Sequence, residues 1–159
     1  MCNINNRAME LAIEESKINL ENEYKKGGPF GAVIVKDKKI LACAHNTVME
    51  DSDPTAHAEI NVIRSVAKKL NTNDLSGCTL YTSTEPCPMC LSAIIWSNIK
   101  EVYFANTRYD ADEIGFRDDA IYKYIEGKNN DILKVHHIDS KEAKEVFEKF
   151  KKIENKILY

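Results

Sequence analysis

Residues 78–97 read CTLYTSTEPCPMCLSAIIWS. The first part of this stretch is rich in Thr, Tyr and apolar residues, which is typical of a β-strand over residues 78–83. Pro86-Cys87-Pro88 then predicts a turn, and the apolar run from Met89 to Ser97 predicts a helix directly after it. A further strand is expected over residues 101–105. A strand, a helix and a strand in this order favour a parallel crossover connection within an α/β sheet.

Upstream of this stretch the sequence predicts two helices and a β-hairpin. Two short apolar runs, Ala32–Val35 and Ile40–Ala44, are separated by four polar residues, which predicts an antiparallel hairpin. Asp53 and Pro54 suit the cap and the first position of a helix, whose apolar residues recur at helical spacing to about Leu70. The elements expected here are a helix over residues 5–25, strands over 32–35 and 40–44, and a helix over 54–70.

Downstream of Asn106 the apolar pattern is looser. A helix is compatible with residues 119–126, and Val135–Ile138 is predicted to be a short edge strand. Asp139 begins a capping-box pattern, which predicts a last helix that ends at about Lys152. With the edge strand included, the sequence predicts five strands in all.

Length and charge exclude several classes of protein. The chain has 159 residues, with 22 Lys and Arg against 25 Asp and Glu, so its formal net charge is −3. This length predicts a single domain over residues 1–159. No apolar run approaches the roughly 18 residues that a membrane span needs, and the polar first residues lack the apolar core of a signal peptide. We therefore expect a cytoplasmic protein with no membrane partner. The slight acidic excess argues against a nucleic-acid groove, which normally shows a basic excess.

Five cysteines stand at positions 2, 43, 78, 87 and 90. An odd number in an intracellular chain is a poor disulfide framework, so paired spacing indicates metal or redox chemistry. Cys87 and Cys90 alone form a tight Cys-x-x-Cys pair. Cys43 and Cys78 lie in apolar, strand-like surroundings and are expected to be small buried residues, whereas Cys2 is expected to be an exposed free thiol.

His57 and the Cys-x-x-Cys pair together predict a zinc site. His57 opens one predicted helix and Cys87 and Cys90 open the next, so all three lie near helix N-termini, where the helix dipole favours thiolates. One imidazole nitrogen and two thiolates suit tetrahedral zinc and leave the fourth position open for water, as in catalytic zinc sites. Glu59, two residues beyond His57, is the candidate that collects and returns the proton of that water.

The alternative is a closed structural zinc site, or simple packing of these side chains. A closed site needs a fourth protein ligand, for which His45 or Cys78 could serve. Such a chain would be a zinc-stabilised binding module without turnover. A His-x-Glu motif one helix before a proline-flanked Cys-x-x-Cys pair favours the catalytic site.

Further segments surround these motifs: GGPFGAVIV at residues 27–35, DPTAHAE at 53–59 and GFRDD at 115–119. His-x-Glu with Pro-Cys-x-x-Cys is the signature of zinc nucleobase deaminases. Over about residues 5–126 the chain resembles the cytidine/nucleobase deaminase superfamily and, within it, bacterial guanine deaminases. The resemblance implies a three-layer α-β-α cytidine deaminase-like fold, in which helices flank a mixed five-stranded sheet and zinc lies at the starts of two helices.

The resemblance also implies roles for individual side chains. Phe30 would stack on a purine base and Asn46 would hydrogen-bond its edge, where the alternatives are core packing for Phe30 and a turn for Asn46. Asp118 would contact the leaving amine and act as a catalytic residue beside Glu59, with Asp119 as the alternative at that position.

The reaction that the resemblance implies is the zinc-dependent hydrolysis of guanine to xanthine and ammonia. The family further implies a homodimer that exchanges C-terminal segments, about residues 140–159, so that Tyr159 closes the pocket of the other copy. Two other reactions stay open: tRNA adenosine deamination, because such enzymes share DPTAHAE almost letter for letter, and deamination of another nucleobase or an aminotriazine. The absence of a dense Lys/Arg stripe from the sequence favours a small base over tRNA.

Overall fold

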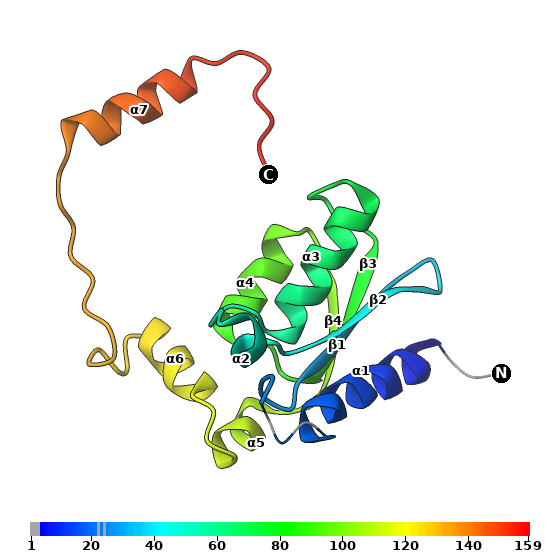
Figure 1. Cartoon of the computed structure of the whole chain (residues 1–159). Coiled ribbons are helices and arrows are strands. Elements are labelled where there is room, and N and C mark those ends of the chain that lie inside the picture. The colour runs from blue at the N-terminus through cyan, green and yellow to red at the C-terminus, as the bar shows by residue number, and fades with distance from the viewer. Residues whose placement is uncertain (1–3, 22, 24) are drawn as a thin grey trace.

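A mixed sheet lies at the centre of the molecule (Figure 1). The computed structural model describes residues 4–21, 23 and 25–159, and within that part of the chain the sheet has four strands in the order β2-β1-β3-β4. β1 pairs antiparallel with both β2 and β3, and β3 pairs parallel with β4. The strands are β1 (Gly31–Lys36), β2 (Lys39–His45), β3 (Cys78–Thr84) and β4 (Glu101–Asn106).

The predicted hairpin and the predicted parallel crossover are both confirmed. Asp37 and Lys38, between β1 and β2, have φ values of 50° and 60°, the left-handed backbone that a two-residue hairpin turn requires. The crossover from β3 to β4 runs through α4. The helices are α1 (Ile4–Glu21), α2 (Val48–Asp51), α3 (Ala58–Leu70), α4 (Pro88–Trp96), α5 (Arg108–Glu113), α6 (Asp118–Ile125) and α7 (Lys141–Lys151).

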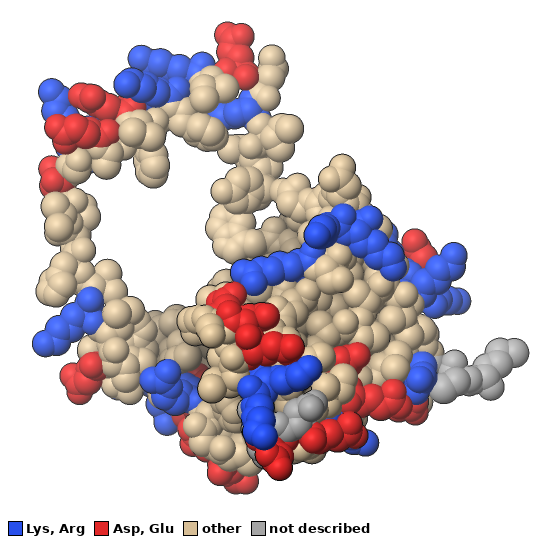
Figure 2. Space-filling model, viewed as in Figure 1, with Lys and Arg blue, Asp and Glu red and all other residues tan. Residues whose placement is uncertain are grey.

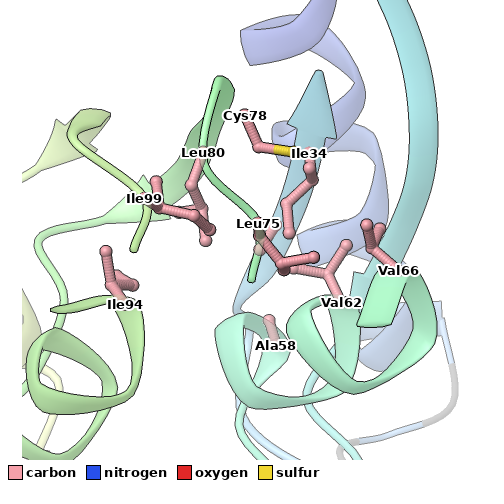
Figure 3. Packing of buried hydrophobic residues seen from close by; sticks show 10 residues of the cluster. Ile34, Ala58, Val62, Val66, Leu75, Cys78, Leu80, Ile94 and Ile99 are labelled. Carbon is pink, nitrogen blue, oxygen red and sulfur yellow. The ribbon is translucent and has the colours of Figure 1, made fainter. Parts of the chain in front are cut away.

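Helices cover both faces of the sheet and make three layers. Successive side chains of a strand point to opposite faces, so Ile34 of β1 packs with α3 and α4 while Val33 and Val35 pack against α1. The larger cluster lies between the sheet and the pair α3 and α4 (Figure 3). It includes Ile34, Val62, Val66, Leu75, Leu80, Ile94 and Ile99, all of which are buried.

The prediction of a five-stranded sheet is wrong. Val135–Ile138, the predicted edge strand, is extended but belongs to no sheet, and Val135 and Ile138 are 76% and 85% exposed. After α6 the chain runs away from the sheet, so this segment does not lie beside an edge that it could pair with (Figure 1). β4 is therefore an edge strand of the described sheet, and its Tyr103 and Phe104 are partly exposed.

The helix predicted from Pro54 begins four residues later, at Ala58. The side chain of Asp53 accepts hydrogen bonds from both the backbone N–H and the hydroxyl of Thr55, at 2.8 and 2.7 Å. This local turn competes with helix formation, as aspartate side chains often do. The delay makes His57 the N-cap residue of α3.

The cysteines outside the predicted metal site differ in burial. Cys78 is buried in the larger core cluster, as predicted, whereas Cys43 is half-buried on β2. The prediction for Cys2 falls outside the described residues. In the part of the chain that the structure describes, no helix is long and apolar enough to cross a lipid bilayer.

Residues 126–159, the C-terminal arm, extend away from the three layers (Figure 1). α7 has no buried residue, and its apolar Phe147 is 79% exposed. The arm turns back at its end, where the ring of Tyr159 lies 5.9 Å from that of Trp96 on α4. Figure 2 shows open space between the arm and the body of the molecule. The arm therefore carries apolar side chains that its own chain leaves uncovered.

Candidate metal and active site

The predicted metal ligands lie at two neighbouring helix N-termini. His57 is the N-cap residue of α3, and Cys87 is the N-cap residue of α4, with Pro88 at its first helical position. Cys90 lies one turn further along α4, so it shares a face with Cys87. The positive ends of both helix dipoles point to this place, which stabilises thiolates and other negative charge there.

The spacing of the three ligand atoms fits one zinc ion. Nδ1 of His57 lies 3.7 Å from Sγ of Cys87 and 3.5 Å from Sγ of Cys90. Ligands bound to zinc at about 2.0–2.3 Å in tetrahedral directions lie about 3.5–3.8 Å apart. All three atoms are within 4.8 Å of one another, and both cysteines are buried. A borderline-soft donor set of one nitrogen and two sulfurs is also the chemistry that zinc prefers.

The two thiols have pKa values that move apart. A hydrogen bond from Cys90, followed by one with His57, lowers the pKa of the Cys87 thiol. The same bond to Cys87 and burial raise the pKa of Cys90, while the bond to Cys87 raises the pKa of His57. Cys87 is therefore readily a thiolate before any cation binds, whereas Cys90 keeps its proton until a cation displaces it.

Neither residue considered for a closed site joins this cluster. The ring of His45 pairs with Glu15 at 3.0 Å, and Cys78 packs in the core beside Ile34 and Leu80 (Figure 3). Among the described residues, the group of side chains that could hold a metal ion consists of His57, Cys87 and Cys90. Three protein ligands are the number found in catalytic zinc sites.

Glu59 is buried beside the metal ligands. Its side chain is 6% exposed; one carboxylate oxygen accepts a hydrogen bond from the hydroxyl of Thr82 at 3.0 Å and the other from Sγ of Cys90 at 3.5 Å. Burial raises the pKa of this carboxyl group. A carboxylate that is fixed in place and easily protonated has the properties of a proton shuttle.

A cavity of about 780 Å³ opens beside the metal ligands, a size typical of small-molecule sites. The structure brings Phe30, Asn46, Glu59 and Asp118 together in its wall. The ring of Phe30 meets that of Phe116 edge-on, with centroids 4.7 Å apart and planes at 80°. One wall of the cavity is therefore aromatic, while its polar groups include Asn46, Glu59 and Asp118.

The two neighbouring aspartates at the start of α6 lie in different surroundings. Asp118 lines the cavity, and burial, followed by the charge of Cys87, raises its pKa. Asp119 is buried and forms ion pairs with Lys123 at 2.6 Å and Arg108 at 3.6 Å. Asp119 thus fixes α6, and Asp118 is the member of the pair that a ligand can reach.

Tyr159, predicted to close the pocket of the other copy, does not line the cavity of its own chain. It is 81% exposed and rests against Trp96.

The structure adds supporting residues to those predicted from the sequence. Thr82 hydrogen-bonds Glu59, and Tyr122 donates its hydroxyl to the carbonyl of Pro86 at 2.7 Å, which ties α6 to the loop before Cys87. The backbone N–H of Arg108 donates to Glu85 at 2.9 Å. Thr82 could have been noticed, because it is a polar residue in the middle of a strand whose two faces are both buried. The others depend on contacts between segments distant in sequence.

The sequence of this chain is similar to those of known deaminases. The family described as the cytidine and deoxycytidylate deaminase zinc-binding region matches residues 3–106. The guanine deaminase of Bacillus subtilis is 50% identical over 120 residues, which cover 76% of this chain and 73% of that protein. The tRNA-specific adenosine deaminase of Aquifex aeolicus is 44% identical over 98 residues, or 61% of this chain and 62% of that one.

A solved structure also matches. The X-ray structure of guanine deaminase from Bacillus subtilis superposes with a TM-score of 0.87 at 39% sequence identity, and the match covers 96% of this chain and 97% of that chain.

Proposed function

This chain belongs to the cytidine and deoxycytidylate deaminase family, and from this premise we propose that it is a zinc-dependent guanine deaminase, which hydrolyses guanine to xanthine and ammonia. The observation that carries the choice of guanine is the match to a solved guanine deaminase along nearly the whole chain, past the shared metal motifs. The match to a tRNA-specific adenosine deaminase covers less of this chain, 61%. Turnover of free purine bases would place the protein in the cytoplasm.

His57, Cys87 and Cys90 would hold the zinc ion. When bound there, zinc supplies a Lewis acid that lowers the pKa of a water molecule to about 7. Glu59 takes a proton from the attacking water and delivers it to N3 of the base. The water oxygen bonds to C2, and Asp118, whose pKa is raised by burial, donates a proton to the amine on that carbon. The C2–N bond then breaks and ammonia leaves. Glu59, which has given its first proton to N3, takes the remaining proton from the oxygen on C2 and returns it to Asp118, so xanthine remains and both carboxyl groups are restored.

The rest of the cavity orients the base. Phe30 offers an aromatic face for stacking, and Phe116 supports that ring from the side. The side-chain oxygen of Asn46 accepts the backbone N–H of Val48 at 3.1 Å, which fixes the direction of the amide. Asn46 then presents its amide to the polar edge of the purine.

Ammonia release from guanine, guanosine, adenine, cytosine and cytidine tests the proposal. We expect turnover of guanine far above that of the other four, and its loss in Glu59→Gln with zinc retained. Preferential release from another base would overturn the assignment of guanine. A filter-binding assay with tRNA at moderate salt tests the alternative function, tRNA adenosine deamination. We expect no tight binding, because Lys and Arg are interspersed with Asp and Glu over the face shown in Figure 2.

We also propose that two copies exchange their C-terminal segments, about residues 140–159, and that Tyr159 closes the pocket of the partner copy. The proposal rests on the exposed apolar face of α7 and on the position of Tyr159 outside its own pocket. Light scattering should give twice the chain mass. A mixture of Glu59→Gln chains with chains that lack Tyr159 should recover activity that neither has alone, because one pocket of each mixed dimer is complete. A monomer, or no recovery on mixing, would contradict the exchange.

A further inference from the structure

Asn19 is a fully buried polar residue in the last turns of α1, outside every motif of the metal site. Its side-chain NH2 group donates two hydrogen bonds, one to the carbonyl of Gly28 at 2.7 Å and one to the carbonyl of Asn46 at 2.8 Å. Because both partners are carbonyls, the amide nitrogen must face them. One side chain of α1 therefore ties together two loops that line the cavity.

These two bonds complete a closed ring of hydrogen bonds. The carbonyl of Gly28 also accepts the N–H of Phe30 at 2.9 Å. The carbonyl of Phe30 in turn accepts the N–H of Asn46 at 3.1 Å. Asn19 joins the two ends of this series, so the backbone positions of Phe30 and Asn46 are set relative to each other through its amide.

An asparagine at this position also carries two costs in stability. Its side-chain oxygen has no hydrogen-bond partner among the residues that the structure describes, and a buried polar atom without a partner is unfavourable. Asparagine is also a weaker helix former than leucine or alanine. An apolar residue would avoid both costs but could not hold the two carbonyls.

We propose that Asn19 is a positioning residue for purine binding, which sets the spacing between the stacking ring of Phe30 and the amide of Asn46. This inference rests on the proposed function, because it assigns those two residues to the base. Asn19 does not touch the base itself. Its loss should weaken binding of substrate and product alike, and so change KM more than kcat.

The test compares Asn19→Leu and Asn19→Asp with the wild type in KM and kcat for guanine, in the Kd of xanthine measured by calorimetry, and in bound zinc. We expect Asn19→Leu to raise KM and Kd about tenfold, the effect of losing roughly 1.4 kcal/mol, with zinc retained and kcat changed much less. Asn19→Asp keeps the shape and can donate one bond only while protonated. Its KM relative to the wild type should therefore rise with pH, which gives the answer if the leucine variant fails to fold.

Tyr81→Phe is the matched control. The hydroxyl of Tyr81 donates to Asn5 at 2.7 Å and ties the other end of α1 to the sheet, far from the cavity. This variant should lower the Tm and leave KM and Kd unchanged. Asn19 variants that behave in the same way would overturn the proposal. If the wild type neither deaminates guanine nor binds xanthine, the proposed function has failed instead, and the same comparison is then made with the base that the ammonia assay identifies.

Discussion

Gly27→Ala should impair substrate binding without loss of zinc. A Cβ at this position would lie 2.2 Å from the side-chain oxygen of Asn46 and 2.7 Å from its backbone oxygen. The first distance falls about 1.2 Å short of the 3.4 Å at which ordinary contact begins. Because the backbone oxygen is also too close, rotation of the side chain alone cannot relieve the clash, and Asn46 must move as a whole.

A displacement of about 1 Å in a group that positions substrate can cost roughly a hundredfold in rate. We therefore expect kcat/KM for guanine to fall by about this factor in Gly27→Ala, mostly through KM. Zinc content, measured by mass spectrometry, should match the wild type because the three metal ligands are not displaced. Steady-state ammonia release gives the rate constants.

Gly77→Ala separates this effect from a general loss of stability. Gly77 has φ of 78° and lies before β3, with space for a Cβ, so alanine there strains the backbone but does not touch the cavity. It should lower the Tm by about 2–4 °C, as roughly 1 kcal/mol does in a domain of this size, with kcat/KM unchanged. A kcat/KM for Gly27→Ala within about threefold of the wild type would refute the reasoning. It would show that a displacement of Asn46 by about 1 Å does not impair catalysis.

Three further predictions concern the carboxylates and the metal. Glu59→Gln should keep zinc and lose about 10²–10⁴-fold in kcat, as measured by ammonia release beside metal analysis; equal turnover would exclude Glu59 as the proton shuttle. His57→Ala should lose zinc on dialysis and have a lower Tm that added chelator no longer changes, whereas retained metal would contradict its place in the ligand set. Asp118→Asn should lower kcat strongly without lowering the Tm, because burial already opposes the charge of this group, while Asp119→Asn should lower the Tm and spare most of kcat. The opposite pattern in the two aspartate variants would reverse their roles.

The features that the sequence predicted well are those decided by neighbouring residues. The hairpin follows from two apolar runs around a polar turn, and α4 follows from the apolar run behind the turn at Pro86-Cys87-Pro88, within one residue of its predicted start. His57, Cys87 and Cys90 could be grouped because the local sequence places each ligand within about one turn of a predicted helix N-terminus.

The features that the sequence did not predict depend on contacts across the fold. Val135–Ile138 has the composition of a strand, but the path of the chain after α6 leaves it no edge to pair with. The delayed start of α3 depends on a side-chain turn at Asp53 that outweighs the helix signal of Pro54. Asn19 carries no local signal at all, since its partners lie 9 and 27 residues away.

The ring of hydrogen bonds around the cavity has a consequence for how such a pocket can diversify. Both bonds that Asn19 donates end on main-chain carbonyls, and the other two members of the ring join main-chain groups. The side chains at positions 30 and 46 therefore lie outside this ring, although that of Asn46 also accepts the backbone N–H of Val48. A designer, or natural selection, can exchange the side chain at position 30 to suit a different heterocycle while the frame that carries it keeps its shape.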